Sequence, residues 1–339
     1  MWEIWEGNLK ERIMKITMAH GSGGKSSEEL MEQVFGRHFA NPILDKMEDA
    51  AVLEVSGRIA FSTDTFVVNP LEFKGGNIGK LAICGTVNDL LMMGAQPKYL
   101  TCGFVLEEGL EVELLERVVA TMADYARQAG VLIVAGDTKV VEGQGGLFIN
   151  TSGIGIIEEG THISAANCRP GDAILLSGTL GDHHGAILSA RMGMENGIHS
   201  DCALLSDMTD ALRKEGISVR AMRDVTRGGL GTILNEIAGK SRCQFEIEET
   251  AIPMKEEVAA FCDILGLEPL YMANEGKMVL FVPEEEAEKA LAILRDTKNG
   301  KEAAIIGRVR EGSGVRMITR LGGSRLIDVL YGEGLPRIC

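Results

Sequence analysis

Segments with the periodicity of an amphipathic helix alternate along this chain with short runs of β-branched residues, and this alternation restricts the fold more than any other feature. The clearest helical pattern covers residues 112–129 and stops at Gly130. Runs rich in Val and Ile lie at 131–135 and 147–157, and such residues favour strands. The alternation predicts a mixed αβ (α+β) fold rather than a helical bundle or a β-sandwich.

The same patterns predict the other elements and divide the chain. A capping box of Ser26 and Glu29 predicts a helix start. Further helices are expected at 78–93, 203–215, 230–238, 256–265 and 284–294, and strands at 51–55, 59–62, 173–177, 245–247 and 277–282. With 339 residues, two domains are expected, and a polar break at 158–170 separates them. We expect an N-terminal extension at 1–15, domains at 16–158 and 159–325, and a tail at 326–339.

Charge and hydropathy argue against several classes of protein. The net charge is −15, and no basic block of the kind that follows nucleic acid occurs. No run of about 18 apolar residues predicts a membrane span, and the first residues lack the apolar core of a signal peptide. We therefore expect a cytoplasmic protein that uses neither nucleic acid nor a membrane as its partner. The seven cysteines include no Cys-x-x-Cys pair, so a disulfide framework or zinc site is not expected.

A glycine-rich stretch near the N-terminus resembles a P-loop only superficially. Residues 19–26 satisfy a relaxed Walker A pattern, but the preceding residues include Lys15 and Thr17 and make a poor central strand. A flexible loop whose backbone N–H groups close over phosphates fits better, with Gly23 and Gly24 at its centre. A plain glycine turn is the alternative.

Four separate aspartates are candidate metal ligands. Each is expected at a strand end or turn beside small or apolar residues, not within a solvated charge run. Carboxylate oxygens are what Mg²⁺ prefers, with waters and nucleotide phosphates completing its shell. Taken singly, each has the alternative of capping a turn or helix. The four are Asp49, Asp64, Asp89 and Asp137.

Cationic and histidine-bearing segments add to this set. Lys139 follows Asp137 and Thr138 at the end of an apolar strand, where its ammonium could reach a phosphate. The run Thr226-Arg227-Gly228 leads into a predicted helix whose N-terminal N–H groups favour an anion. His183 and His184 precede another helix. Adjacent side chains on a helix diverge, so at least one of them is expected to be structural.

Three motifs in order resemble one enzyme superfamily. They are Gly85-Thr86-Val87-Asn88-Asp89, Ala135-Gly136-Asp137-Thr138 and Asp224-Val225-Thr226-Arg227-Gly228-Gly229. They look like the signatures of the aminoimidazole ribonucleotide synthetase (PurM-like) superfamily. Residues 75–85, the run Ala273-Asn274-Glu275-Gly276-Lys277 and the ending Leu335-Pro336-Arg337-Ile338-Cys339 resemble its hydrogenase-maturation branch. The resemblance covers nearly the whole chain.

The resemblance implies two PurM-like domains and an ATP- and Mg²⁺-dependent enzyme. The first domain is expected to bind ATP and to pair its sheet across a homodimer. The four aspartates would handle Mg²⁺ and phosphates, and Lys139 and Glu275 would line the reacting centre. The implied partners are a carbamoyltransferase and an iron-carrying scaffold that accepts cyanide. Nucleotide contacts are expected from Gly23, Gly24, Asn88, Asp89, Thr138, Thr226, Arg227 and Gly228. This chain has His183-His184 where the family usually shows one histidine before glycine, so which of them occupies the family position stays open.

A cysteine at the last position suits a carrier arm. Chain termini are normally mobile, and Gly332, Gly334 and Pro336 suit a tail that inserts rather than packs permanently. The implied reaction is ATP-dependent dehydration of a carbamoyl group on Cys339 to a thiocyanate, which provides cyanide for [NiFe]-hydrogenase. The alternatives are another kinase or synthetase of the superfamily and a non-catalytic thiol carrier. A selenophosphate synthetase is disfavoured because Met18-Ala19-His20-Gly21 lacks a reactive cysteine.

Overall fold

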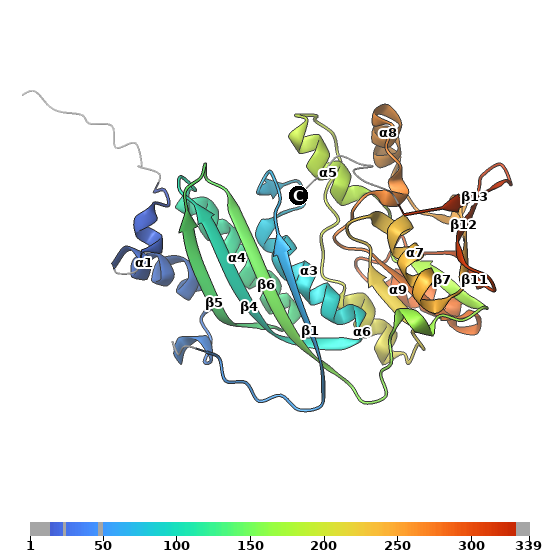
Figure 1. Cartoon of the computed structure of the whole chain (residues 1–339), viewed down its shortest axis with the longest axis horizontal. Helices are drawn as coiled ribbons and strands as arrows, with labels where there is room; N and C mark the ends of the chain where they lie inside the picture. Colours follow the sequence, from blue (N-terminus) through green and yellow to red (C-terminus); the bar gives the residue numbers. More distant parts are fainter. Residues whose placement is uncertain (1–13, 23–24, 47–49, 330–339) are drawn as a thin grey trace, which may run out of the picture.

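The computed structural model describes residues 14–22, 25–46 and 50–329. Its first half is built on a four-stranded sheet in the order β1-β6-β4-β5, in which β4 and β5 run parallel and the other pairs are antiparallel. The helices α3 and α4 pack on one face of this sheet (Figure 1). The bounds are β1 Arg58–Phe66, α3 Ile78–Met92, β4 Ala95–Glu107, α4 Val112–Ala129, β5 Leu132–Val141 and β6 Leu147–Ile157.

The other face of this sheet is not covered by any described segment, and Figure 1 looks onto it. A row of apolar residues crosses all four strands on this face. In strand order β1-β6-β4-β5, neighbouring members of the row are paired, and they are Phe61, Ile154, Tyr99 and Leu132. Phe61 is 65% exposed. A contiguous exposed apolar surface of this kind marks an interaction site more often than a plain solvent face.

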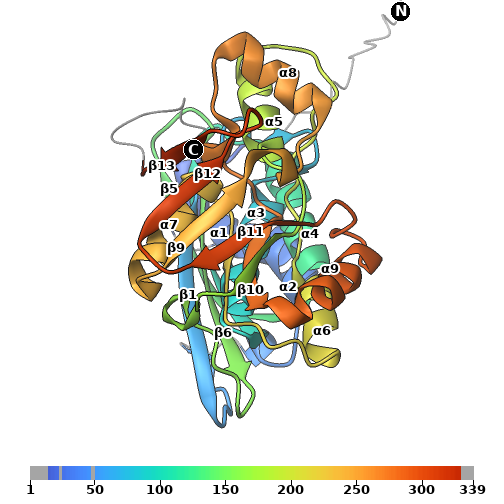
Figure 2. The ribbon, with the colours of Figure 1, turned by 90° about the vertical axis from the view of Figure 1, so that its right-hand side faces the viewer.

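The second half holds a seven-stranded sheet in the order β13-β12-β9-β11-β7-β10-β8, seen in Figure 2. Its neighbours are antiparallel except for the parallel pair β9 and β12. One face packs against α6 and α9 and the other against α7. The strands are β7 Asp172–Leu176, β8 Ala221–Asp224, β9 Gln244–Glu248, β10 Met278–Pro283, β11 Ala304–Arg310, β12 Gly314–Ile318 and β13 Ser324–Ile327. The helices are α5 Asp182–Arg191, α6 Ser206–Lys214, α7 Gly229–Ser241, α8 Glu256–Leu265 and α9 Ala287–Asp296.

The two halves share a hydrophobic core. One apolar cluster extends from α3 and α4 through α6 and α9 to the inner face of the second sheet. Smaller elements complete the described chain: α1 Lys25–Leu30, a π-helical turn Met31–Gly36, α2 Arg37–Phe39, and the short pair β2 Glu72–Phe73 and β3 Gly76–Asn77. Among the described helices, none combines the length and the apolar character needed to cross a membrane.

Most predicted elements are present, but several details are wrong. Residues 51–55 form no strand, because β1 pairs with β6 alone and Val52 is left exposed. The helix at Ser26 already includes Lys25, so Ser26 is not its cap. The tail is predicted to begin at 326, but Leu326 and Ile327 belong to β13, which pairs with β12.

The longest strand, β4, is absent from the sequence-based prediction. Its sequence includes Pro97 and Gly103 and is poor in β-branched residues. Pairing on both sides, to β6 and to β5, provides the stability that local propensity does not. Pro97 lies at a register shift between β4 and β6, which is where a sheet tolerates proline. The strands β8, β11, β12 and β13 are missed as well.

Candidate active site

Two of the predicted metal ligands meet between the sheet and helix of the first half. Asp64 lies within β1 and Asp89 within α3, so neither stands at a strand end or turn as predicted. Thr86 Oγ1 donates to Asp64 Oδ2 (3.4 Å), and Ser62 Oγ donates to Asp89 Oδ2 (2.6 Å). Burial, with the nearby charge of Asp89, raises the pKa of Asp64 to about 6.

Two carboxyl groups of the second half face this pair. Asp224 ends β8, and Glu275 lies in the loop before β10. Burial and the charge of Asp89 raise the pKa of Asp224 to about 7. Burial, with the charges of Asp224 and Asp201, raises the pKa of Glu275 well above its usual range, and the guanidinium of Arg227 opposes this shift. Asp224 and Asp201, whose charges raise the pKa of Glu275, were not identified from the sequence as residues of the site.

Excess negative charge at this junction is what a Mg²⁺-bound nucleotide would relieve. Asp64 and Asp89 repel each other, and Arg227 is the cation that lowers the pKa of Asp64. Among the described residues, no group of three or more His, Cys, Asp or Glu side chains is arranged to hold a metal ion. Two carboxylates alone would leave an ion such as Mg²⁺ to take its remaining ligands from phosphates and water.

We expect replacement of Asp224 by asparagine to stabilise the ligand-free chain in a pH-dependent way. A buried carboxyl with a raised pKa favours the protonated folded state, so the parent loses stability as pH rises from the ordinary value of 3.8 through about 7. The introduced amide does not titrate. The variant's unfolding free energy relative to the parent should be higher at pH 8 than at pH 5 by more than about 1 kcal/mol. Urea unfolding at the two pH values measures it, and a pH-independent difference would contradict the buried charge.

Asp137, Thr138 and Lys139 lie elsewhere. They are inside β5, the edge strand farthest from β1, and not at a strand end. Lys139 Nζ pairs with Asp137 Oδ2 (3.0 Å), and both side chains are exposed on the uncovered sheet face. Three strand spacings, about 14 Å, separate β5 from β1. Within one chain the structure does not bring these residues to Asp64 or Glu275.

The loop before α7 has the predicted helix-terminus geometry. Gly228 caps the helix with φ 80°, and Gly229 follows with φ 63°. A Cβ on Gly229 would lie 2.4 Å from Leu270 O, so the close approach as well as the φ requires glycine. The loop places Arg227 at the junction, where it lowers the pKa of Asp64 and Glu275. Thr226 O accepts from Gly229 N (3.0 Å).

Asn88 and the two histidines contact other parts of the second half. The Asn88 amide donates to Ala203 O (3.0 Å) and accepts from Leu205 N (2.9 Å). His183 and His184 are both buried in α5. His183 Nδ1 lies 2.8 Å from Ser200 Oγ, and burial lowers its pKa to about 4. His183 is thus a neutral, packed side chain. Gly23, Gly24, Asp49 and Cys339 lie outside the described residues.

Comparisons with known proteins agree with the two-part architecture. Residues 47–157 match the N-terminal domain of AIR synthase related proteins, and residues 169–320 match their C-terminal domain. A carbamoyl dehydratase HypE from Rhodobacter capsulatus is 50% identical over 338 residues, which is 97% of this chain and 99% of that protein. This chain belongs to the carbamoyl dehydratase HypE family.

Solved HypE structures share the fold. The crystal structure of hydrogenase maturation protein HypE in complex with ATP superposes with a TM-score of 0.91 at 50% identity, covering 95% of this chain and 99% of that one. HypE in a HypE–HypF complex gives a TM-score of 0.78 at 47% identity, covering 89% and 99%. The fold is therefore PurM-like in both halves, as the sequence motifs predicted.

Proposed function

We propose that this chain dehydrates an S-carbamoyl group on its own Cys339 to a thiocyanate, at the expense of ATP. The observation that carries the proposal is the junction of the two halves. There, a partly buried Glu275 with a raised pKa faces Asp64, Asp224 and Arg227. Membership of the carbamoyl dehydratase family supports the reaction class, and the terminal cysteine provides the atom that carries the carbamoyl group.

In the proposed reaction, the amide oxygen of S–CO–NH2 attacks the γ-phosphoryl group of ATP and ADP leaves. Loss of phosphate and the amide protons then gives S–C≡N. ATP would convert the amide oxygen into a leaving group, and a bound Mg²⁺ would offset the charge of the phosphates. The raised pKa makes Glu275 a stronger base than an exposed glutamate, which suits it to take an amide proton. Lys139 would stabilise charge on the amide oxygen or the transferring phosphoryl group.

Mg²⁺ and ATP would be held by the residues predicted from the motifs. Asp64 and Asp89 are suited to the ion because their carboxyl groups lie close to each other and interact electrostatically with Asp224 across the junction. Asp49 and Asp137 are proposed to join them. The nucleotide phosphates would lie against Thr226, Arg227 and Gly228 at the start of α7, with contacts also from Gly23, Gly24, Asn88 and Thr138.

A homodimer would complete the site. Lys139 and Asp137 lie on the uncovered sheet face of β5, away from Glu275 of the same chain. The apolar row on that face favours a second copy as its partner. Pairing of two such faces would bring Lys139 and Asp137 of one chain toward the junction of the other.

Two protein partners follow from this chemistry. A carbamoyltransferase must load Cys339, and the relative solved as a HypE–HypF complex supports a partner of this kind, because there a HypE binds a second protein, HypF. An iron-carrying scaffold is proposed to accept the cyanide. Release of the cyano group as cyanide takes two electrons and one proton, which the iron-carrying scaffold would have to provide, and would leave the sulfur of Cys339 as a thiol.

The mass of the C-terminal peptide tests the proposal. In the first step, the chain is incubated with a carbamoyltransferase, carbamoyl phosphate and Mg²⁺. In the second step, ATP is added to one half of the sample and withheld from the other. We expect a carbamoyl adduct on Cys339 that loses one water only when ATP is added. If no adduct forms on Cys339 while the transferase is active on a control peptide, the proposal is wrong. Another kinase or synthetase activity of the superfamily would then be favoured.

A further inference from the structure

One short segment of the second half joins both parts of the proposed site. Residues 200–205, here the bridging segment, bind the first half through backbone and amide groups. Ser200 N donates to Lys74 O (2.8 Å). Asn88, next to Asp89 on α3, bonds Ala203 O and Leu205 N. The bridging segment is therefore fixed relative to the helix that carries Asp89.

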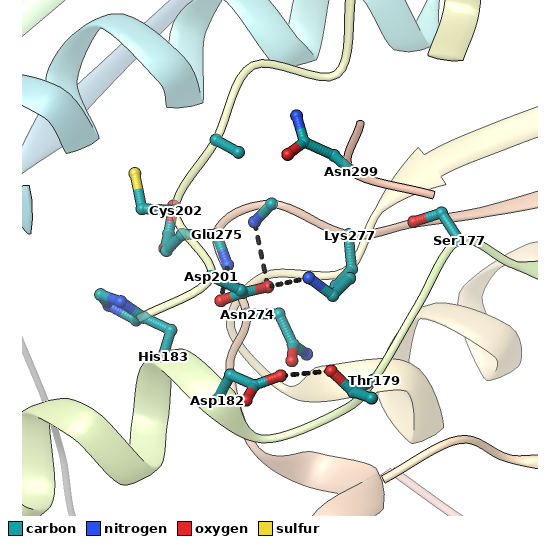
Figure 3. Close-up of polar contacts among 12 residues, drawn as sticks. Ser177, Thr179, Asp182, His183, Asp201, Cys202, Asn274, Glu275, Lys277 and Asn299 are labelled. Atoms are coloured by element: carbon teal, nitrogen blue, oxygen red, sulfur yellow. Dashed lines mark hydrogen bonds and ion pairs between the residues drawn. The ribbon is translucent and has the colours of Figure 1, made fainter. Parts of the chain in front are cut away.

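The same segment holds the backbone of Glu275 (Figure 3). Asp201 Oδ1 accepts from Glu275 N (3.1 Å), and Asp201 Oδ2 accepts from Gly276 N (3.3 Å). In return, Ala203 N donates to Glu275 O (3.3 Å). A carboxylate that accepts two adjacent backbone N–H groups makes charge-assisted bonds, which are stronger than neutral ones.

The contact is too close to allow a side chain in between. A Cβ built on Gly276 would lie 1.9 Å from Asp201 O. Asp201 is balanced by Lys277, whose Nζ lies 3.3 Å from Asp201 Oδ2. The two side chains are 2% and 11% exposed, so this is a buried ion pair. Buried pairs add little net stability but fix geometry, because loss of either partner leaves an uncompensated charge.

The bridging segment is anchored at its start as well. Ser200 Oγ lies 2.8 Å from His183 Nδ1 and accepts from Cys202 N (3.1 Å). The His183 ring packs edge-to-face with Phe73 of the first half, with ring centroids 5.6 Å apart. These contacts leave Asp201 little freedom to move relative to α5 and α3.

We infer that Asp201 is a positioning residue that sets the place of Glu275 relative to Asn88 and Asp89, with Lys277 as its counterion. It acts through the Glu275 backbone and does not touch the reacting atoms. The inference rests on the proposed role of Glu275. A general base displaced by about 1 Å costs on the order of 100-fold in rate, so a buried clamp of this kind has a measurable effect.

The test is a single-turnover measurement with chain already S-carbamoylated on its terminal cysteine. The rate of water loss is followed by intact mass over a range of ATP concentrations. For Asp201→Asn, which puts an amide N–H where Gly276 N or Lys277 needs an acceptor, we expect a maximal rate about 100-fold lower. The ATP concentration for half-maximal rate should change less than about threefold, because the Asp201 carboxylate bonds Glu275, Gly276 and Lys277, which are not among the proposed phosphate contacts.

A matched control is Asp172→Asn. Asp172 is also a buried aspartate that accepts a backbone N–H, from Arg169 (2.7 Å), and pairs with Arg220, but it lies at the far end of β7 and β10 from Glu275. A loss of general stability would slow both variants alike, and equal rates for the two would overturn the inference. An Asp201→Asn variant that raises the ATP requirement as much as it lowers the rate would overturn it too.

Lys277 provides a second route if Asp201→Asn does not fold. Lys277→Met keeps the packing of the stem against Gly178 and removes the counterion. We expect its maximal rate to fall about tenfold and Lys277→Arg to restore it to within about threefold. A full rate for Lys277→Met would overturn the ion-pair part. Absence of water loss in the parent itself would reject the proposed function instead, so the two failures are distinguishable.

Discussion

A chain with Cys339→Ser is expected to form no thiocyanate at any ATP concentration. The serine hydroxyl is not ionised near neutral pH and is a poor acceptor for a carbamoyl group, and its carbamate could not give an S–C≡N product. Because the substitution changes one atom at the chain end, folding should be unaffected. Mass analysis of the C-terminal peptide after the two-step incubation measures the product, and thermal unfolding checks the fold.

The control for this variant is a cysteine elsewhere. Cys243 is buried, and its thiol donates only weakly, to Cys168 O and Ser241 O, both at 3.6 Å. Cys243→Ser retains a donor there and should retain product formation, with at most a modest loss of stability. Thiocyanate formation by Cys339→Ser would contradict the proposal, because another thiol would then carry the carbamoyl group. The same conclusion would follow if Cys243→Ser alone formed no thiocyanate.

Glu275→Gln should lower the maximal rate of dehydration by about 10³-fold, the middle of the range for a removed general base. Glutamine has the same shape but cannot take up the amide proton. Because burial raises the pKa of Glu275, its carboxylate form costs folding free energy at pH 8, and the uncharged variant should be at least as stable as the parent there. Single-turnover rates on S-carbamoylated chain provide the measurement. A rate within tenfold of the parent would remove Glu275 from the reaction.

The same variant can show whether the site is shared between two chains. Glu275→Gln and Lys139→Ala chains carrying different tags are co-expressed, and doubly tagged dimers are isolated. Each mixed dimer has one site with both residues intact if the site takes Lys139 from one chain and Glu275 from the other. We then expect about half of the parent rate per dimer. If the mixed dimers are as inactive as dimers of either single variant, both residues act within one chain.

Local patterns predicted the elements that carry strong local signals. The helix α4 and the strand β6 begin and end where their periodicity does, since α4 is amphipathic and stops at Gly130 with φ 68°. The strand β4 has no such signal and depends on its two neighbours. The motifs alone indicated the superfamily, because their order along the chain is more specific than any one of them, and the comparisons confirmed it.

The candidate site was predicted as a list of residues, but its layout was not. Asp64 and Asp137 were expected at strand ends, yet β1 and β5 continue past them because neighbouring strands prolong the pairing. Asp201 belongs to no motif, and its proposed role depends on a contact between the bridging segment and Glu275, 74 residues further along the chain. Contacts of that sequence separation leave no periodic trace. The terminal cysteine, by contrast, could be recognised only from the sequence.

Burial of the other thiols affects which cysteine a carbamoyl donor can modify. The chain has seven cysteines, and the six in the described residues are all buried and unbridged. Burial also raises the pKa of Cys102, Cys168 and Cys262, which keeps them protonated and poor nucleophiles. A carbamoyl donor therefore meets no competing acceptor among them. If Cys339 is loaded as proposed, the fold itself protects the six described cysteines, and the loading enzyme need not discriminate against them.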